Sequence, residues 1–396
     1  VFLYVNEPRM QPDAFFNVAG RSGMRGAPDR QGAGYRAMCT EDPATLAWLE
    51  GCLKDLFSDV KGLGGVFTIT MSETMTHCAS QFKNVQEKCP RCKGKPYEYF
   101  IRKVNEAVVR GVKGGNKDAE VWFYDVGWEV EGTDRKVIAD LPKEGSLILW
   151  SEKYLPFEQA GIRQKVTEYS ISHPGPADRA LSMWKMAKDA GLGCVAKLQV
   201  SCSWEISAVP YLPAMDLVAK HAYNLAQSPV DSVMLSWSLG GYPSPNLALF
   251  GEFRRGDGID DVLERTALKL YGKEAAPAVR RAWSAYSKAF SEYPIVWQTV
   301  YYSPVQMGPA NLLYPEKTGV PATMVNTPYD DFTRWTSGYA ANREGWVEQM
   351  RLTAEGFEKG DELWKEVVAK AQGRAKTAAE SDAVVFRAAT LHWRTC

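Results

Sequence analysis

Short apolar runs alternate with helix-like segments along roughly the first 240 residues of the chain. This alternation is typical of βα units arranged around a parallel sheet. The candidate strands are residues 1–6, 35–39, 65–71, 120–126, 146–150, 165–171, 194–201 and 231–237. Eight such runs predict an α/β fold in which the strands close into a (β/α)8 barrel of the TIM type.

The segments between these runs have helical periodicity. Asp42 can cap a helix with Pro43 at its first position, and residues 178–190 and 214–226 form two further amphipathic segments. The predicted apolar stripe of the first helix consists of Leu46, Leu49, Leu53 and Leu56.

One connection is too short for a crossover helix. The residues between Trp150 and Lys165, SEKYLPFEQAGIRQ, lack a clear helical period, so 165–171 can be a hairpin partner instead of a barrel strand. The barrel would then have seven strands here, and its first strand would precede Val1. We favour this second count.

The pattern changes to helices alone beyond residue 255. Residues 274–292 and 342–371 have amphipathic spacing, and a stretch with Pro and Gly, 303–329, predicts a long loop between them. We therefore predict a barrel over 1–255 and a helical region packed on it over 256–396.

Composition narrows the possible functions. Lys plus Arg and Asp plus Glu both number 47, so no net charge favours nucleic acid or a membrane surface. The chain has no uninterrupted apolar stretch of about 18 residues that could span a bilayer. Aromatic residues make up 12% of the chain, with 13 Trp and 18 Tyr, and several lie beside Gly or Pro in predicted loops. Such aromatics suit flat, partly apolar ligands.

The predicted strands end in acids and aromatic rings. In a barrel the loops after the strands build the active site, so these residues are candidates for one site. They are Glu7, Arg9, Cys39, Ser72, Glu73, Asp125, Trp128, Trp150, Glu152, Glu168, Tyr169, Trp204, Glu205, Trp237 and Tyr242.

Acids combined with indoles indicate carbohydrate as the ligand. The C–H face of a sugar rests on an aromatic ring, and glycosidic cleavage needs one protonated and one ionised carboxyl group. Glu73 follows a run that is buried in most folds, so loss of solvent can raise its pKa as a general acid requires. We predict a glycoside hydrolase with Glu73 as general acid/base and Glu205 or Asp125 as its carboxylate partner.

Other interpretations stay open. The acids can pair with cations such as Arg9 and Lys165 while the tryptophans fill the core. A non-catalytic carbohydrate-binding barrel would use the same indoles without the acid geometry. The sequence leaves the sugar, the linkage, the oligomeric state and the localisation open.

The cysteines predict a metal. Cys78, Cys89 and Cys92 supply three thiolates, and the Cys89-x-x-Cys92 spacing is typical of a structural zinc site. The fourth ligand is either Cys39 or His77. Four thiolates would close the metal, so we predict structural zinc and no organic cofactor, whereas His77 with fewer cysteines would make a zinc hydrolase possible.

Several segments resemble the β-N-acetylhexosaminidases of glycoside hydrolase family 20. The stretch CTEDPATLAWLEGCLKDLFSDVKGLGGVFTITMSE resembles a helix and strand that end in an Asp-Glu pair in that family. The segments TEYSISHPGP, SWEISAVPYLP and LSWSLGGYPSPN resemble uncharacterised bacterial family-20-like barrels with a cysteine cluster. The resemblance implies Glu73 as general acid. It also places Ser72 where the family has the acid that orients the substrate's acetamido group.

Overall fold

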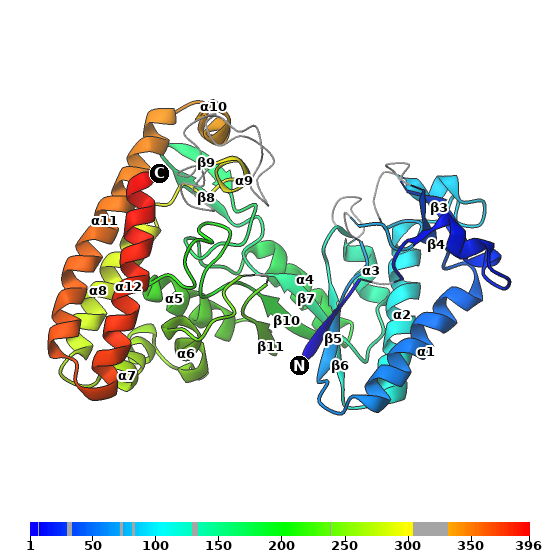
Figure 1. The fold of residues 1–396 in the computed structure, drawn as a ribbon, viewed down its shortest axis with the longest axis horizontal. Helices are drawn as coiled ribbons and strands as arrows, with labels where there is room; N and C mark the ends of the chain where they lie inside the picture. The colour runs from blue at the N-terminus through cyan, green and yellow to red at the C-terminus, as the bar shows by residue number, and fades with distance from the viewer. Residues whose placement is uncertain are drawn as a thin grey trace. The chain divides into compact units, whose positions relative to one another are not determined.

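The computed structural model describes residues 1–6, 8–29, 34–71, 74–80, 84–128, 134–237, 239–303 and 332–396 (Figure 1). The chain divides into two compact units. Unit 1 consists of Val1–Leu149, Ser182–Val195 and Val230–Ser232, and unit 2 of Trp150–Leu181, Ala196–Pro229 and Val233–Cys396. Within the described residues, every helix is too short or too polar to cross a membrane.

A six-stranded sheet has the strand order β1-β5-β6-β7-β10-β11. Strands β1, β5, β6 and β7 pair in parallel with their neighbours in this order. Every residue of β5 is buried, as the continuous apolar run GVFTI predicts for a strand covered on both faces. The strands are β1 (Phe2–Val5), β5 (Gly65–Ile69), β6 (Glu120–Tyr124), β7 (Ser146–Trp150), β10 (Gly193–Lys197) and β11 (Ser232–Met234).

The α/β class and the parallel pairing are therefore confirmed, but a closed eight-stranded barrel is not. Within the described residues the sheet has six strands, with β1 and β11 at its two ends. Two of the eight predicted barrel strands are not members of this sheet.

The first of these is the run 35–39. It forms β4 (Tyr35–Met38), which pairs antiparallel with β2 (Gln11–Pro12) and β3 (Arg25–Pro28) in a separate three-stranded sheet. The prediction of a barrel strand was wrong here because a short apolar run does not reveal whether its partner runs parallel or antiparallel.

The second is the run 165–171. An antiparallel hairpin joins β8 (Pro156–Gln159) to β9 (Ile162–Lys165), so strand structure ends where the predicted strand begins. Ala160 and Gly161 both have positive φ at the turn, which is the conformation of a two-residue hairpin loop. The hairpin alternative was thus correct in kind, although the hairpin lies several residues earlier.

Unit 1 contains α1 (Pro43–Asp59), α2 (Tyr97–Gly115) and α3 (Asp134–Asp140). The backbone N–H of Ala44 donates to the Asp42 carboxylate, which confirms the predicted cap. The buried row of α1 is Thr45, Leu49, Leu53 and Phe57, with a spacing of four residues. It differs from the predicted leucine stripe, because Leu56 is 37% exposed.

Helix α4 (Asp178–Asp189) spans the boundary between the units in sequence. Unit 2 contains a set of packed helices (Figure 1). Helix α8 packs against α11, and α11 packs against α12. Tyr286 and Phe386 meet edge to face, and the Trp364 ring packs on Phe386 in the same way. The helices are α5 (Met215–Ala226), α6 (Pro245–Glu252), α7 (Ile259–Tyr271), α8 (Ala276–Phe290), α9 (Trp297–Tyr302), α10 (Phe332–Trp335), α11 (Arg343–Lys370) and α12 (Gly373–Thr395).

The helices predicted at 274–292 and 342–371 are present as α8 and α11, whereas α12 was not predicted. The predicted loop 303–329 lies, apart from Ser303, outside the described residues. The division of the chain into a barrel over 1–255 and a helical region over 256–396 stays a prediction.

Glycines allow α1 and α2 to approach closely. A Cβ atom on Gly111 would lie 2.6 Å from the Glu50 carbonyl oxygen, whereas one on Gly114 would meet only the Lys54 side chain at 3.6 Å. We expect Gly111→Ala to lower the free energy of unfolding by about 1–2 kcal/mol, because overpacking outweighs the gain in helix propensity.

Gly114→Ala is the matched control for this change. It should leave the stability unchanged or raise it by up to about 1 kcal/mol. Urea unfolding monitored by circular dichroism measures both variants. Equal effects of the two substitutions would show that α1 and α2 do not pack as described.

Candidate functional site

The residues predicted for the site fall into three groups in the structure. Glu7, Ser72 and Glu73 lie outside the described residues. Asp125 and Trp128 belong to unit 1, and Arg9 in the same unit is exposed. The members that lie in unit 2 are Trp150, Glu152, Glu168, Tyr169, Trp204, Glu205, Trp237 and Tyr242.

A buried lysine is central to the unit 2 group. Lys197 is the last residue of β10, and its side chain is 0% exposed. Its ammonium group lies 3.8 Å from the centroid of the Tyr169 ring and 4.8 Å from that of Trp237. Burial lowers the pKa of Lys197 to about 7, although attraction to Glu152 and Glu168 opposes this change. Two of the predicted aromatic residues therefore surround a cation.

Glu168 is the titratable group beside this lysine. Its side chain is 7% exposed, and its Oε2 accepts a hydrogen bond of 2.5 Å from the Tyr301 hydroxyl group. The Tyr169 backbone N–H donates to Oε1. Burial raises the pKa of Glu168, and Tyr301 and Lys197 reduce the rise. Burial among aromatic rings thus biases the Glu168 carboxyl group towards its protonated form.

Glu152 is a second buried acid in unit 2. It follows β7, is 0% exposed, and accepts hydrogen bonds from the Ser151 hydroxyl group and the Ser170 backbone N–H. The Ser151 Oγ also lies 2.8 Å from Nε2 of His221. Burial raises the pKa of Glu152 to about 7 and lowers that of His221 to about 3. Both groups are therefore biased towards their neutral forms.

Glu205 differs from these two acids because hydrogen-bond donors surround it. Its oxygens accept from the hydroxyl groups of Ser170, Ser172 and Ser203 and from the backbone N–H of Ile171 and Ser172. Its side chain is 0% exposed. Burial raises the pKa of Glu205, and these donors oppose the rise. The contacts fit a carboxylate that shapes the 170–172 loop, and the catalytic role predicted for Glu205 stays a prediction.

The predicted tryptophans are mostly core residues. Trp128 is 0% exposed, and its indole N–H donates to the Thr70 hydroxyl group, while Trp204 is 8% exposed. The Trp150 ring packs on Tyr169 with centroids 4.7 Å apart. Tyr242, in contrast, is 61% exposed. Asp125 follows β6 and is 1% exposed.

Sequence reasoning missed Lys197 and Tyr301. A single lysine within the apolar run CVAKLQVS was a usable signal, because a charged residue in a buried strand needs a special environment. Tyr301 gave no signal, since it lies 133 residues from Glu168 along the chain.

The four predicted cysteines come together in unit 1. The Sγ atoms of Cys39, Cys78, Cys89 and Cys92 all lie within 4.8 Å of one another, and all four residues are buried. Cys39 is 3.5 Å from Cys92 and 3.7 Å from Cys89. Four thiolates placed tetrahedrally about 2.3 Å from a zinc ion would be about 3.8 Å apart. The quartet can therefore hold a metal ion.

The structure also distinguishes between the two candidates for the fourth ligand. A parallel bridge between Met38 and His77 places the following residues, Cys39 and Cys78, side by side. The His77 ring lies elsewhere: its Nε2 is 2.7 Å from the Thr70 carbonyl oxygen, and its Nδ1 accepts from the Ala79 N–H. The donor set is thus four cysteines without His77.

Comparisons with known proteins add little beyond this geometry. No family model matches the chain, and no curated protein matches it. Solved structures that resemble it include the glycoside hydrolase domain of PelA from Pseudomonas aeruginosa, at 15% identity and a TM-score of 0.34 over 59% of this chain and 76% of that one.

Two further structures are similar at the same level. CpGH89 from Clostridium perfringens, in complex with its substrate GlcNAc-α-1,4-galactose, has 10% identity and a TM-score of 0.46 over 93% of this chain and 37% of that one. A chitobiase from Flavobacterium johnsoniae has 12% identity and a TM-score of 0.32 over 98% of this chain and 60% of that one. At these values the likeness carries no information on substrate or mechanism.

The contacts of Glu205 predict a large effect on stability. Glu205→Gln keeps the shape of the side chain but replaces one carboxylate oxygen with an amide NH2 group, so the donors to that oxygen lose their acceptor. We expect a loss of about 2–4 kcal/mol in the free energy of unfolding. Urea unfolding measures it, with Glu344→Gln on the exposed first turn of α11 as control. A loss below about 0.5 kcal/mol, the scatter of surface substitutions, would contradict the structural role of Glu205.

Proposed function

We propose that the protein is a glycoside hydrolase in which Glu168 is the general acid. One observation carries this proposal: a nearly buried carboxyl group with a raised pKa, bound to Tyr301 and placed beside Tyr169 and Lys197. Glycosidic cleavage needs an acid that keeps its proton near neutral pH and gives it to the leaving oxygen. Burial among aromatic rings shifts the pKa of Glu168 in the direction that this role requires.

Lys197 and Tyr301 would act after the proton leaves. The carboxylate formed on Glu168 is stabilised by the Tyr301 hydroxyl group, which donates to Oε2, and by the positive charge of Lys197. Both groups are in place before the reaction, so the change of charge needs little reorganisation. The aromatic rings around Lys197 would pack against the C–H face of a sugar.

The catalytic roles of Glu73 and Asp125 stay proposals from the sequence alone. Each residue follows a predicted strand, and Asp125 lies directly after β6 in unit 1. In unit 2, Glu205 is a weak candidate for a second carboxylate beside Glu168, because donors from its own surroundings already occupy its oxygens. An N-acetylhexosaminidase-like activity is the narrower form of this proposal and rests on the family 20 resemblance of the MSE segment.

We further propose that the cysteine quartet binds a structural zinc ion. Thiolate ligands and a closed tetrahedral arrangement favour zinc over harder ions and leave no position for a reacting water molecule. The ion would join Cys39, directly after β4, to Cys78 and to the Cys89-x-x-Cys92 turn. Its contribution would therefore be to folding.

Substitution of Glu168 tests the catalytic proposal through the leaving group. Glu168→Gln should lower turnover of phenyl glycosides by about 10²–10⁴-fold, because phenoxide needs a proton to leave. Turnover of the corresponding dinitrophenyl glycosides should fall much less, since that leaving group departs without protonation. Steady-state kinetics of parent and variant on both substrates give the two ratios.

Glu344→Gln on the surface of unit 2 is the control and should behave like the parent. Equal losses on both leaving groups would remove the acid role of Glu168. Absence of turnover by the parent on every aryl glycoside tested would contradict the enzyme proposal itself.

Removal of the metal tests the zinc proposal. Elemental analysis should find one zinc ion per chain, and a chelator should lower the free energy of unfolding by an amount on the order of 5 kcal/mol. Cys39→Ser should lose the zinc, whereas Cys52→Ser should keep it, because Cys52 is exposed on α1 and lies outside the quartet. A metal-free protein with unchanged stability would contradict the proposal.

A further inference from the structure

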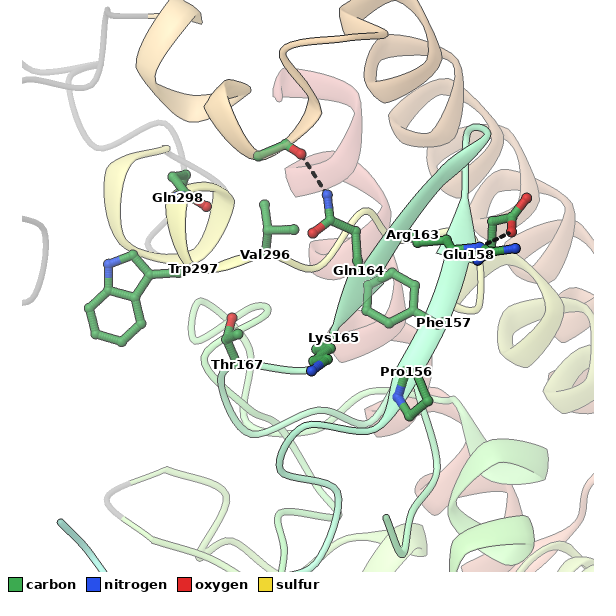
Figure 2. A pocket seen from close by; sticks show the side chains of 11 residues that line it. Pro156, Phe157, Glu158, Arg163, Gln164, Lys165, Thr167, Val296, Trp297 and Gln298 are labelled. Carbon is green, nitrogen blue, oxygen red and sulfur yellow. Dashed lines mark hydrogen bonds and ion pairs between the residues drawn. The ribbon is translucent and has the colours of Figure 1, made fainter. Parts of the chain in front are cut away.

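An open cleft of about 790 Å³ lies in unit 2 beside the β8–β9 hairpin (Figure 2). Phe157 of the hairpin and Trp297 at the start of α9 provide its aromatic surfaces. Lys165 and Thr167 line the cleft and appear between the two rings in the view of Figure 2. None of these residues has a role in the function proposed above.

Two connections link the cleft to Glu168, the proposed acid: one through the chain and one through side-chain contacts. Thr167, which lines the cleft, precedes Glu168 in the chain. The Trp297 ring, which also lines the cleft, packs on Tyr301 with centroids 4.2 Å apart, and the Tyr301 hydroxyl group donates to Glu168. One turn of α9 thus connects the aromatic surface of the cleft to the carboxyl group. A ligand in the cleft would reach the neighbourhood of Glu168.

The charges that line the cleft are unbalanced. Arg163 pairs with Glu158 at 3.5 Å, so these two groups largely neutralise each other. Lys165 has no ion-pair partner among the residues that the structure describes, and it is exposed. The local field therefore favours an anionic group on the ligand.

Trp297 has the exposure that a sugar platform needs. Its side chain is 43% exposed, whereas Trp150 and Trp204 are buried. An exposed indole packed against Tyr301 offers a rigid apolar face, and the ammonium group of Lys165, which lines the same cleft, offers a charge-assisted hydrogen bond. These two features together match a sugar ring that carries an acidic substituent.

We propose that this cleft binds a glycan unit that carries a carboxylate or sulfate group, next to the unit that Glu168 acts on. The ring of this unit stacks on Trp297, and its anionic group pairs with Lys165. The neighbouring position rests on the proposed function, but binding in the cleft does not require turnover.

Calorimetric titration of the Glu168→Gln protein tests the proposal, because this variant lacks the proposed acid and leaves the probes intact. The probes are a hyaluronan tetrasaccharide with carboxylates, a carrageenan tetrasaccharide with sulfates alone, and the neutral chitotetraose. At least one anionic probe should bind about 10-fold or more tightly than chitotetraose, and which one does so identifies the anionic group.

Added substitutions separate the two contacts. Lys165→Gln should lower the affinity for the anionic probe to the level of chitotetraose and leave chitotetraose unchanged, while Lys376→Gln on α12 should change neither. Trp297→Ala should lower the affinity for all three probes. The Lys165 variant keeps the test valid if the Trp297 variant does not fold, because Lys165 is exposed.

Equal affinities for charged and neutral probes, or equal losses on both from Lys165→Gln, would overturn the proposal. The kinetic test of Glu168 has a separate outcome. If the parent is inactive but shows the expected binding pattern, the hydrolase proposal fails and the proposal of glycan binding in the cleft stands. If the parent is active but lacks that pattern, the binding proposal fails and the hydrolase proposal stands.

Discussion

The site in unit 2 depends on one buried acid, Glu205, whose oxygens are enclosed by hydrogen-bond donors of the protein itself. Glu205 accepts hydrogen bonds from backbone and hydroxyl groups of residues 170–172 and from Ser203. A fully buried charge of this kind is tolerated only where several donors compensate for the loss of water. Because residues 170–172 follow Glu168 directly, the same contacts fix the loop that presents Glu168 to Tyr301 and Lys197. Glu205 thus supports the loop that carries Glu168, and the catalytic role that the sequence predicts for Glu205 stays a prediction.

Burial shifts the pKa values of the acids and of the lysine in this site in opposite directions. It raises the pKa of Glu152 to about 7 and also raises that of Glu168, while it lowers the pKa of Lys197 to about 7. Each group would favour its neutral form alone, and the attraction between the lysine and the acids opposes this tendency. The pKa values of Glu152 and Lys197 therefore both lie at about 7, and the pKa of Glu168 is raised above its ordinary value. The Tyr169 and Trp237 rings pack around the Lys197 ammonium group. Helix α9 carries Tyr301, which binds Glu168, and Trp297, which packs on Tyr301.

The sequence predicted what depends on local pattern. Continuous apolar runs located β5, β6, β7 and β10, and the cysteine spacing located the quartet, because burial on both faces and chelation by a short turn leave marks in neighbouring residues. Pairing direction leaves no such mark, so 35–39 was placed wrongly in the barrel, and the hairpin favoured for 165–171 lies several residues earlier than the sequence indicated. The environment of an acid is equally non-local. Nothing in SWEIS reveals the donors around Glu205, and nothing near Glu168 reveals Tyr301.

The protonation state of Glu168 tests the account most directly. Infrared difference spectra between the parent and Glu168→Gln, recorded as the pH is raised, isolate the carboxyl band of this one residue. The account predicts a protonated C=O band that persists above pH 4.5, the ordinary pKa of a glutamate side chain. A carboxylate band already complete at that pH would show that Glu168 is ionised in the folded protein, and the acid proposed here would have no proton to give.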